Sequence, residues 1–154
     1  MKISDIMTAA AVTERPSDTL AEAALKMWEQ QTGSLLVLRD QAVEGIITER
    51  DILKAVAQEA DLKSVTVAEV MATEVITAHA STSLREAARL MTQHWIRHLP
   101  VVEQGRLVGI VSQRDLAGVL AGALNEPEAL QQLVESSGLA REQRLNRIEK
   151  GVWD

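Results

Sequence analysis

Two short stretches of this chain end in residue types that can bind a phosphate and a sugar. They read Gly-Ile-Ile-Thr-Glu-Arg-Asp over residues 45–51 and Gly-Ile-Val-Ser-Gln-Arg-Asp over residues 109–115. In each stretch an apolar strand leads into a hydroxyl residue that would begin a helix, beside an arginine. The free N–H groups of such a helix start can receive phosphate oxygens, and the closing aspartate can accept hydrogen bonds from a ribose diol. The pattern therefore has the chemistry of a nucleotide site.

The same residues also allow a structural interpretation. Thr48 with Asp51, and Ser112 with Asp115, have the spacing of a capping box. In a capping box the hydroxyl and the acid satisfy backbone N–H groups at the start of the helix, and the helix dipole favours the acid there. The motif taken alone leaves both interpretations open.

Both stretches belong to an internal repeat. An offset of 64 residues, the separation of Asp51 from Asp115, aligns residues 5–56 with residues 69–120 without a gap, and 14 of the 52 pairs are identical. Each copy predicts a short strand, a helix, two strands and a second helix. The first helices should begin after Thr19 and Ser83, because each is followed three residues later by a glutamate. We expect short strands near 11–13 and 75–77, paired strands over 35–38 with 43–48 and 99–102 with 107–112, and second helices over about 48–59 and 112–124.

A unit of this size buries too little surface to be stable alone. We therefore expect an α/β (α+β) fold in which two β-α-β-β-α domains pack sheet against sheet about a pseudo-twofold axis. The predicted domains span residues 1–60 and 69–124, with a linker over 61–68 and a helical tail over 125–154. The charged part of that tail, residues 141–150, is either a solvated helix or a docking arm for a partner.

Composition excludes several classes of function. A net charge of −6 argues against nucleic acid or an anionic membrane as the main partner, and the absence of cysteine removes disulfides and thiolate chemistry. His94 and His98 have helical metal spacing, but Leu99 and Pro100 begin a strand directly afterwards and no third ligand stands near, so no metal site is predicted. We find no catalytic triad and no apolar stretch of membrane-spanning length, and we expect a soluble, cytoplasmic protein without enzymatic activity.

The chain resembles a tandem pair of cystathionine β-synthase (CBS) domains, also called a Bateman module. The resemblance covers residues 1–123 and depends on Asp-Ile-Met-Thr at 5–8, Arg-His-Leu-Pro-Val-Val at 97–102 and the two closing stretches. Members of this family bind adenosyl ligands (AMP, ADP, ATP or S-adenosylmethionine) in clefts between the domains and regulate other proteins. The resemblance implies a non-catalytic sensor with such a regulatory ligand, no cofactor, an unidentified target protein and a homodimeric state. A ligand-free adaptor that binds only protein is the alternative, and an enzyme is a third.

The resemblance also implies roles for individual residues in two related clefts. In the first, Asp115 would hold the ribose, and Ser112, Arg114, Arg97, His98 and Thr8 would contact phosphate, with the base against Val12 and the backbone of Thr32, Gly33 and Ser34. In the second, the corresponding residues would be Asp51, Thr48 and Arg50, with Ile76 and the backbone from Ile96 to His98 around the base. Thr8, Arg97 and His98 correspond to Ala72, Gly33 and Ser34. We therefore expect the first cleft to bind an anionic ligand more strongly.

The last helix of the second repeat carries Gly118 and Gly122 one turn apart. Either small residues are merely tolerated there, or they allow two helices to approach closely, across the repeat interface or between subunits. We expect a homodimer that covers apolar faces of the repeat helices, with Val56, Leu116, Val119, Leu120 and Leu124 on them.

Overall fold

The computed structural model describes residues 1–9, 11–123, 142 and 146. The predicted tail therefore lies outside the described residues, apart from Glu142 and Asn146, and so does Leu124. No helix among the described residues is long and apolar enough to cross a membrane.

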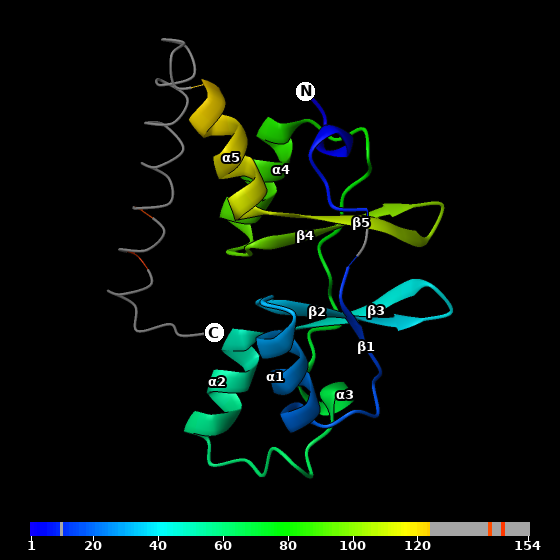
Figure 1. The fold of residues 1–154 in the computed structure, drawn as a ribbon, viewed down its shortest axis with the longest axis vertical. Coiled ribbons are helices and arrows are strands. Elements are labelled where there is room, and N and C mark those ends of the chain that lie inside the picture. Colours follow the sequence, from blue (N-terminus) through cyan, green and yellow to red (C-terminus); the bar gives the residue numbers. More distant parts are fainter. Residues whose placement is uncertain (10, 124–141, 143–145, 147–154) are drawn as a thin grey trace.

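The chain forms two stacked halves whose sheets face each other, with helices on the two outer sides (Figure 1). One half contains β1 (Thr13–Glu14), α1 (Leu20–Glu29), β2 (Ser34–Arg39), β3 (Ala42–Thr48), α2 (Glu49–Ala57) and α3 (Val67–Val70). The other contains the short 3₁₀ helix η1 (Ile3–Asp5), α4 (Leu84–Gln93), β4 (His98–Glu103), β5 (Arg106–Ser112) and α5 (Gln113–Ala123). The predicted fold class is confirmed.

The two first helices begin where the local sequence predicts. Thr19 Oγ1 accepts a hydrogen bond from the Glu22 N–H at 3.2 Å, and the Glu22 carboxylate accepts one from the Thr19 N–H at 2.7 Å. Ser83 Oγ accepts a hydrogen bond from the Glu86 N–H at 3.2 Å in the same position of α4. These bonds satisfy N–H groups that the first turn of a helix cannot pair internally.

The two hairpins repeat the same register. Ser34 pairs with Thr48 in the β2–β3 hairpin, and His98 pairs with Ser112 in the β4–β5 hairpin. Each hairpin has one irregularity, between Val37 and Leu38 or at the corresponding point of the second copy. The offset found in the sequence is thus also the offset between equivalent positions of the structure.

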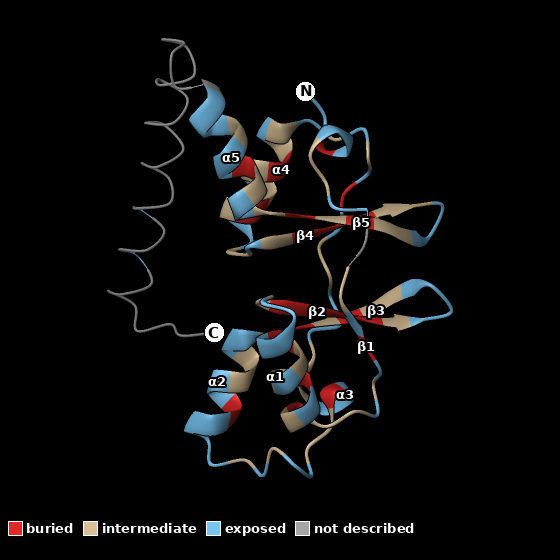
Figure 2. Ribbon diagram, in the orientation of Figure 1, coloured by how far each residue is buried: buried red, intermediate tan, exposed pale blue. Residues whose placement is uncertain are grey.

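The core of each half of the structure contains a residue that lies outside the sequence repeat forming the rest of that half. Ile3 is fully buried in the core of the second repeat, where its N–H donates to the Thr82 carbonyl at 2.8 Å. Val67, which follows the first repeat, is fully buried in the core of that repeat. Figure 2 shows the buried residues gathered on the strands and on the helix faces turned toward them. The two sequence repeats are therefore interlocked and cannot be separated at residues 61–68 without opening both cores.

Two glycines allow the segments around Thr8 and Ala72 to pass close to the strands of the hairpins. Thr8 pairs with Ile110 through two backbone hydrogen bonds of 3.0 Å, beside Gly109. A Cβ atom at Gly109 would lie 2.8 Å from the Thr8 carbonyl oxygen, so a larger residue would push this strand-like contact apart. Gly45 has the same role, because a Cβ there would lie 3.0 Å from the carbonyl oxygen of Ala72.

Two sequence predictions, those of the short strand in each repeat, require correction. The first short strand is Thr13–Glu14 rather than 11–13, and its copy near 75–77 is reduced to a single bridge between Ala78 and Val101. A helical turn, α3, begins at Val67, near the end of the segment 61–68. The segments that lead to β1 and to Ala78 run between the two halves (Figure 1). Only the last residues of each segment therefore lie close enough to a neighbouring strand to pair with it.

The predicted dimer face also changes. Leu116 is buried in the core of the second half, since only 9% of it is exposed, whereas Val56 and Leu120 are exposed as expected. A Cβ atom at Gly118 or Gly122 would meet no described atom within 4 Å. Among the described residues, close packing between the two repeats therefore does not require either glycine.

Candidate functional site

A cavity of about 690 Å³ lies between the two halves. All ten residues predicted for the first cleft line it: Thr8, Val12, Thr32, Gly33, Ser34, Arg97, His98, Ser112, Arg114 and Asp115. The volume is within the range of about 300–1,000 Å³ that is usual for small-molecule sites. The structure thus brings residues from four separate segments to one concave surface.

Seven further residues line the cavity that the sequence did not single out: Ala11, Met27, Trp28, Gln31, Glu49, Ile110 and Gln113. Met27, Trp28 and Gln31 come from the end of α1 and the turn after it, next to the predicted backbone at Thr32. The largest of these side chains, that of Trp28, is 75% exposed. An exposed indole among the residues that line a cavity offers a stacking surface to a ligand.

Asp115 forms the predicted capping box through one of its two carboxylate oxygens. Oδ2 accepts hydrogen bonds from the backbone N–H and from the hydroxyl of Ser112, each at 2.7 Å. Among the described residues, no group donates a hydrogen bond to Oδ1 of Asp115. The capping and ribose-binding interpretations are therefore compatible, because each can use a different oxygen of one carboxylate.

Arg97 forms an ion pair with Glu49, which lies 48 positions earlier in the chain. Glu49 is the first residue of α2, and its N–H donates to the Gly33 carbonyl at 3.0 Å. Its carboxylate lies 3.3 Å from where a Cβ atom at Gly33 would be. The pair joins the two halves across the wall of the cavity, with each side chain about half exposed.

His98 begins β4 at the same wall. Burial lowers the pKa of His98 below its ordinary value of 6.5, and the neighbouring Arg97 lowers it further, whereas Glu49 and Asp115 act in the opposite direction. Its imidazole is therefore neutral at pH 7, so one ring nitrogen can donate a hydrogen bond and the other can accept one.

Ser34 contributes a polar group without a partner. The residue is 3% exposed, and its Oγ has no hydrogen-bond partner among the described residues. Buried hydroxyls in native structures nearly always have a partner, so the unpaired hydroxyl of this cavity-lining residue is a candidate hydrogen-bond partner for a bound water or ligand.

The second predicted cleft has the same helix start with fewer polar side chains. Asp51 Oδ2 accepts hydrogen bonds from the N–H and the hydroxyl of Thr48, at 2.7 and 2.9 Å. Arg50 is exposed on α2, and Ile76 and Ile96 pack against the core of the second half. Ligand binding in this cleft stays a prediction.

The described part of the chain contains no group of three or more His, Cys, Asp or Glu side chains that could hold a metal ion. The polar groups of the cavity are instead hydrogen-bond donors and acceptors together with two arginines.

Comparison with known proteins decides the family. The CBS domain family matches this chain twice, over residues 3–58 and 67–122. The chain belongs to the CBS domain family. The CBS domain-containing protein YhcV of Bacillus subtilis is 41% identical over 116 residues, which cover 75% of this chain and 82% of that protein.

Solved structures of CBS proteins have the same fold. The CBS-domain containing protein ATU1752 from Agrobacterium tumefaciens has a TM-score of 0.74 at 32% identity, covering 77% of this chain and 98% of that one. The CBS domain pair of protein MJ0100 has a TM-score of 0.72 at 31% identity, covering 80% of this chain and 98% of that one. The MJ0100 pair was crystallised in complex with 5′-methylthioadenosine and S-adenosyl-L-methionine.

Proposed function

We propose that this CBS pair is a non-catalytic sensor that binds an adenosyl ligand in the cavity between its halves and signals its presence to a partner protein. The observation that carries the proposal is the cavity itself. Its wall combines the carboxylate residue Asp115 with Arg97, Arg114 and Ser34, contributed by both repeats. A ligand held there would contact both halves, so its binding energy could change how they sit on each other.

The polar groups fit the parts of an adenosyl molecule. A carboxylate oxygen suits a ribose diol, while Arg97 and Arg114 suit an anionic tail. Val12, Met27 and Ile110 supply an apolar surface for the base. The bound adenosyl compounds of the MJ0100 pair support the same ligand class here, at 31% identity and with the same fold.

We further propose that the sensor is a homodimer. The outer faces of α2 and α5 carry Leu53, Val56 and Leu120, which are 68%, 53% and 36% exposed. Apolar side chains that cluster on an exposed helix face are typical of a protein interface. An adaptor that associates with protein and binds no ligand would share this face but would have no use for the polar cavity.

A thermal-shift panel separates the sensor from the adaptor. The melting temperature of the chain is measured alone and with adenosine, AMP, ADP, ATP and S-adenosylmethionine. A ligand at about 100 times its Kd stabilises the native state by about 2.7 kcal/mol, so a sensor should melt several degrees higher with at least one compound. An unchanged melting temperature with all five compounds would favour the adaptor.

A further inference from the structure

Glu49 places a negative charge in the cleft that was predicted from the sequence to bind phosphate. Its carboxylate lines the cavity and pairs with Arg97, one of the expected phosphate ligands. The backbone bond from Glu49 to the Gly33 carbonyl fixes the main chain of Glu49 at the start of α2, and the ion pair with Arg97 directs its side chain toward the cavity. A side chain larger than hydrogen at residue 33 would crowd the Glu49 carboxylate, so the glycine leaves room for it.

Glu49 also sets the charge balance of the cleft. The ionised side chains that line the cavity are Glu49, Asp115, Arg97 and Arg114, two negative and two positive. His98 adds no charge at pH 7, because burial and Arg97 lower its pKa. The formal charge of the cavity wall is therefore zero, which does not match a nucleoside polyphosphate. A polyphosphate tail bound at Arg97 would lie beside the Glu49 carboxylate, which is itself anionic and would repel it.

We propose that Glu49 is a specificity-determining residue of this cleft, which selects adenosyl ligands with a zwitterionic tail over nucleoside polyphosphates. The proposal rests on the proposed function, since it concerns the tail of a bound adenosyl molecule. An amino-acid tail presents a carboxylate and a cationic group a few bonds apart. The adjacent Arg97 and Glu49 side chains are complementary to that pair, because the guanidinium can hold the carboxylate while the Glu49 carboxylate faces the cation.

The second repeat provides a neutral comparison for this position. Gln113 is the first residue of α5 and corresponds to Glu49 by the repeat offset. Its N–H donates to the Arg97 carbonyl at 2.9 Å, as the Glu49 N–H does to that of Gly33. A glutamine is therefore compatible with this helix start. Glu49→Gln should remove the charge without changing the fold.

The test is a set of calorimetric titrations of the full chain and of Glu49→Gln with adenosine, ATP and S-adenosylmethionine. The chain should bind S-adenosylmethionine more tightly than ATP. In Glu49→Gln, ATP affinity should rise about tenfold, S-adenosylmethionine affinity should fall about tenfold and adenosine affinity should stay within about twofold. These changes should shrink at high salt, because both members of the ion pair are about half exposed.

Glu59→Gln is the matched control, since it removes the same charge at an exposed position just after α2, outside the cavity. It should leave all three affinities unchanged. If the chain and Glu49→Gln bind the three compounds with the same relative affinities, or if the chain prefers ATP, the role of Glu49 is overturned while the adenosyl site stands. If none of the three binds either protein, the proposed function fails, and the specificity role fails with it.

Discussion

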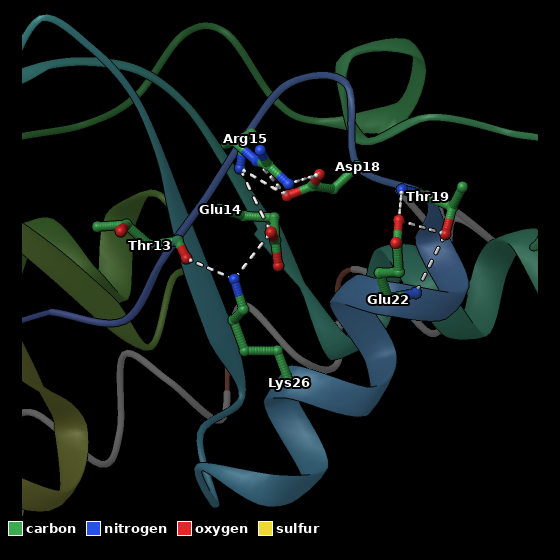
Figure 3. Close-up of polar contacts among 7 residues, drawn as sticks. All are labelled: Thr13, Glu14, Arg15, Asp18, Thr19, Glu22 and Lys26. Atoms are coloured by element: carbon green, nitrogen blue, oxygen red, sulfur yellow. Dashed lines mark hydrogen bonds and ion pairs between the residues drawn. The ribbon is translucent and has the colours of Figure 1, made fainter.

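The buried carboxylate of Glu14 is held by Lys26 at 2.8 Å, across the space between β1 and α1 (Figure 3). The same lysine donates to the Thr13 carbonyl at 3.1 Å. The Glu14 side chain is 1% exposed, and its second oxygen has no hydrogen-bond partner among the described residues. These contacts fix the end of the segment that carries Val12 against the helix that carries Trp28, so they position two walls of the cavity.

Lys26→Met should therefore destabilise the protein. It removes the cation beside a buried carboxylate and should lower the free energy of unfolding by about 2–3 kcal/mol at pH 7. Burial already raises the pKa of Glu14, and Lys26 opposes that rise. Without the lysine the folded-state pKa of Glu14 rises further above its unfolded value of 4.5, so the penalty should diminish as the pH falls toward 4.5.

Urea unfolding measures this effect. Lys54→Met, at an exposed lysine of α2, is the control and should change the stability by less than about 0.5 kcal/mol. The double variant Glu14→Gln/Lys26→Met should recover most of the loss, because it removes both charges of the pair. Equal effects of the two lysine substitutions would show that the buried pair has no role.

The pH dependence of stability should show the neutral state of His98. The pKa of His98 is lower in the native protein than its value of 6.5 in the unfolded chain. As the pH falls below 6.5, the unfolded chain therefore binds a proton at His98 more readily than the native protein does. This contribution leaves the protein most stable above pH 6.5 and is lost as the pH falls below that value. Between about pH 7.5 and about pH 5.5, the native protein should lose more stability than His98→Gln. Parallel curves for the two proteins would contradict the half-buried, neutral imidazole.

Ser34→Ala should have opposite effects on stability and on binding. Removal of the unpaired buried hydroxyl costs no hydrogen bond in the free protein and should raise the free energy of unfolding by about 1 kcal/mol. Affinity for the adenosyl ligand should fall, because the site loses a polar group. Ser17→Ala, at an exposed serine, is the control for both measurements. A destabilised Ser34→Ala that binds normally would assign the hydroxyl to the core.

Light scattering during size exclusion tests the homodimer. The chain should have twice its mass of 16.8 kDa, and Val56→Glu should shift it to the monomer by placing a charge in an apolar interface. Gln58→Glu, at the exposed residue that follows α2, should remain a dimer. A mass of one chain at every concentration would contradict the dimer. A dimeric Val56→Glu would exclude Val56 from the interface.

The helix starts were the most predictable part of the fold, because they depend on residues that are close together in the sequence. The capping boxes at Thr19 and Ser83 depend on residues three positions apart, so the helix starts they predict are confirmed. The turns of η1 and α3 escaped prediction, because three or four residues are too few to show a helical period. The exchange of Ile3 and Val67 between the two cores was also missed, since nothing local to either residue shows which repeat it will pack against.

Part of the candidate site was likewise predictable from the sequence, and part of it depends on contacts between distant residues. Asp115, Arg97 and Ser34 could be named from the repeat and from the family resemblance, and the structure brings them to one cavity. Glu49 was missed as a cavity residue because in the sequence it belongs to the motif of the other repeat. Its role depends on contact with Arg97, 48 positions away, and on the room that Gly33 leaves. Only the packing of the two halves brings these residues together.

Calorimetric titration of Asp115→Ala and Asp51→Ala with S-adenosylmethionine tests the adenosyl site most directly. Both variants lose the same capping interaction, to Ser112 or to Thr48, so their stability losses should match at about 1 kcal/mol. The native chain should bind at roughly micromolar strength, about −8 kcal/mol. Asp115→Ala should weaken binding by about 2 kcal/mol, or about 30-fold, because the ribose loses its acceptor, whereas Asp51→Ala should weaken it much less. Equal affinity of the native chain and Asp115→Ala would contradict an adenosyl site at Asp115.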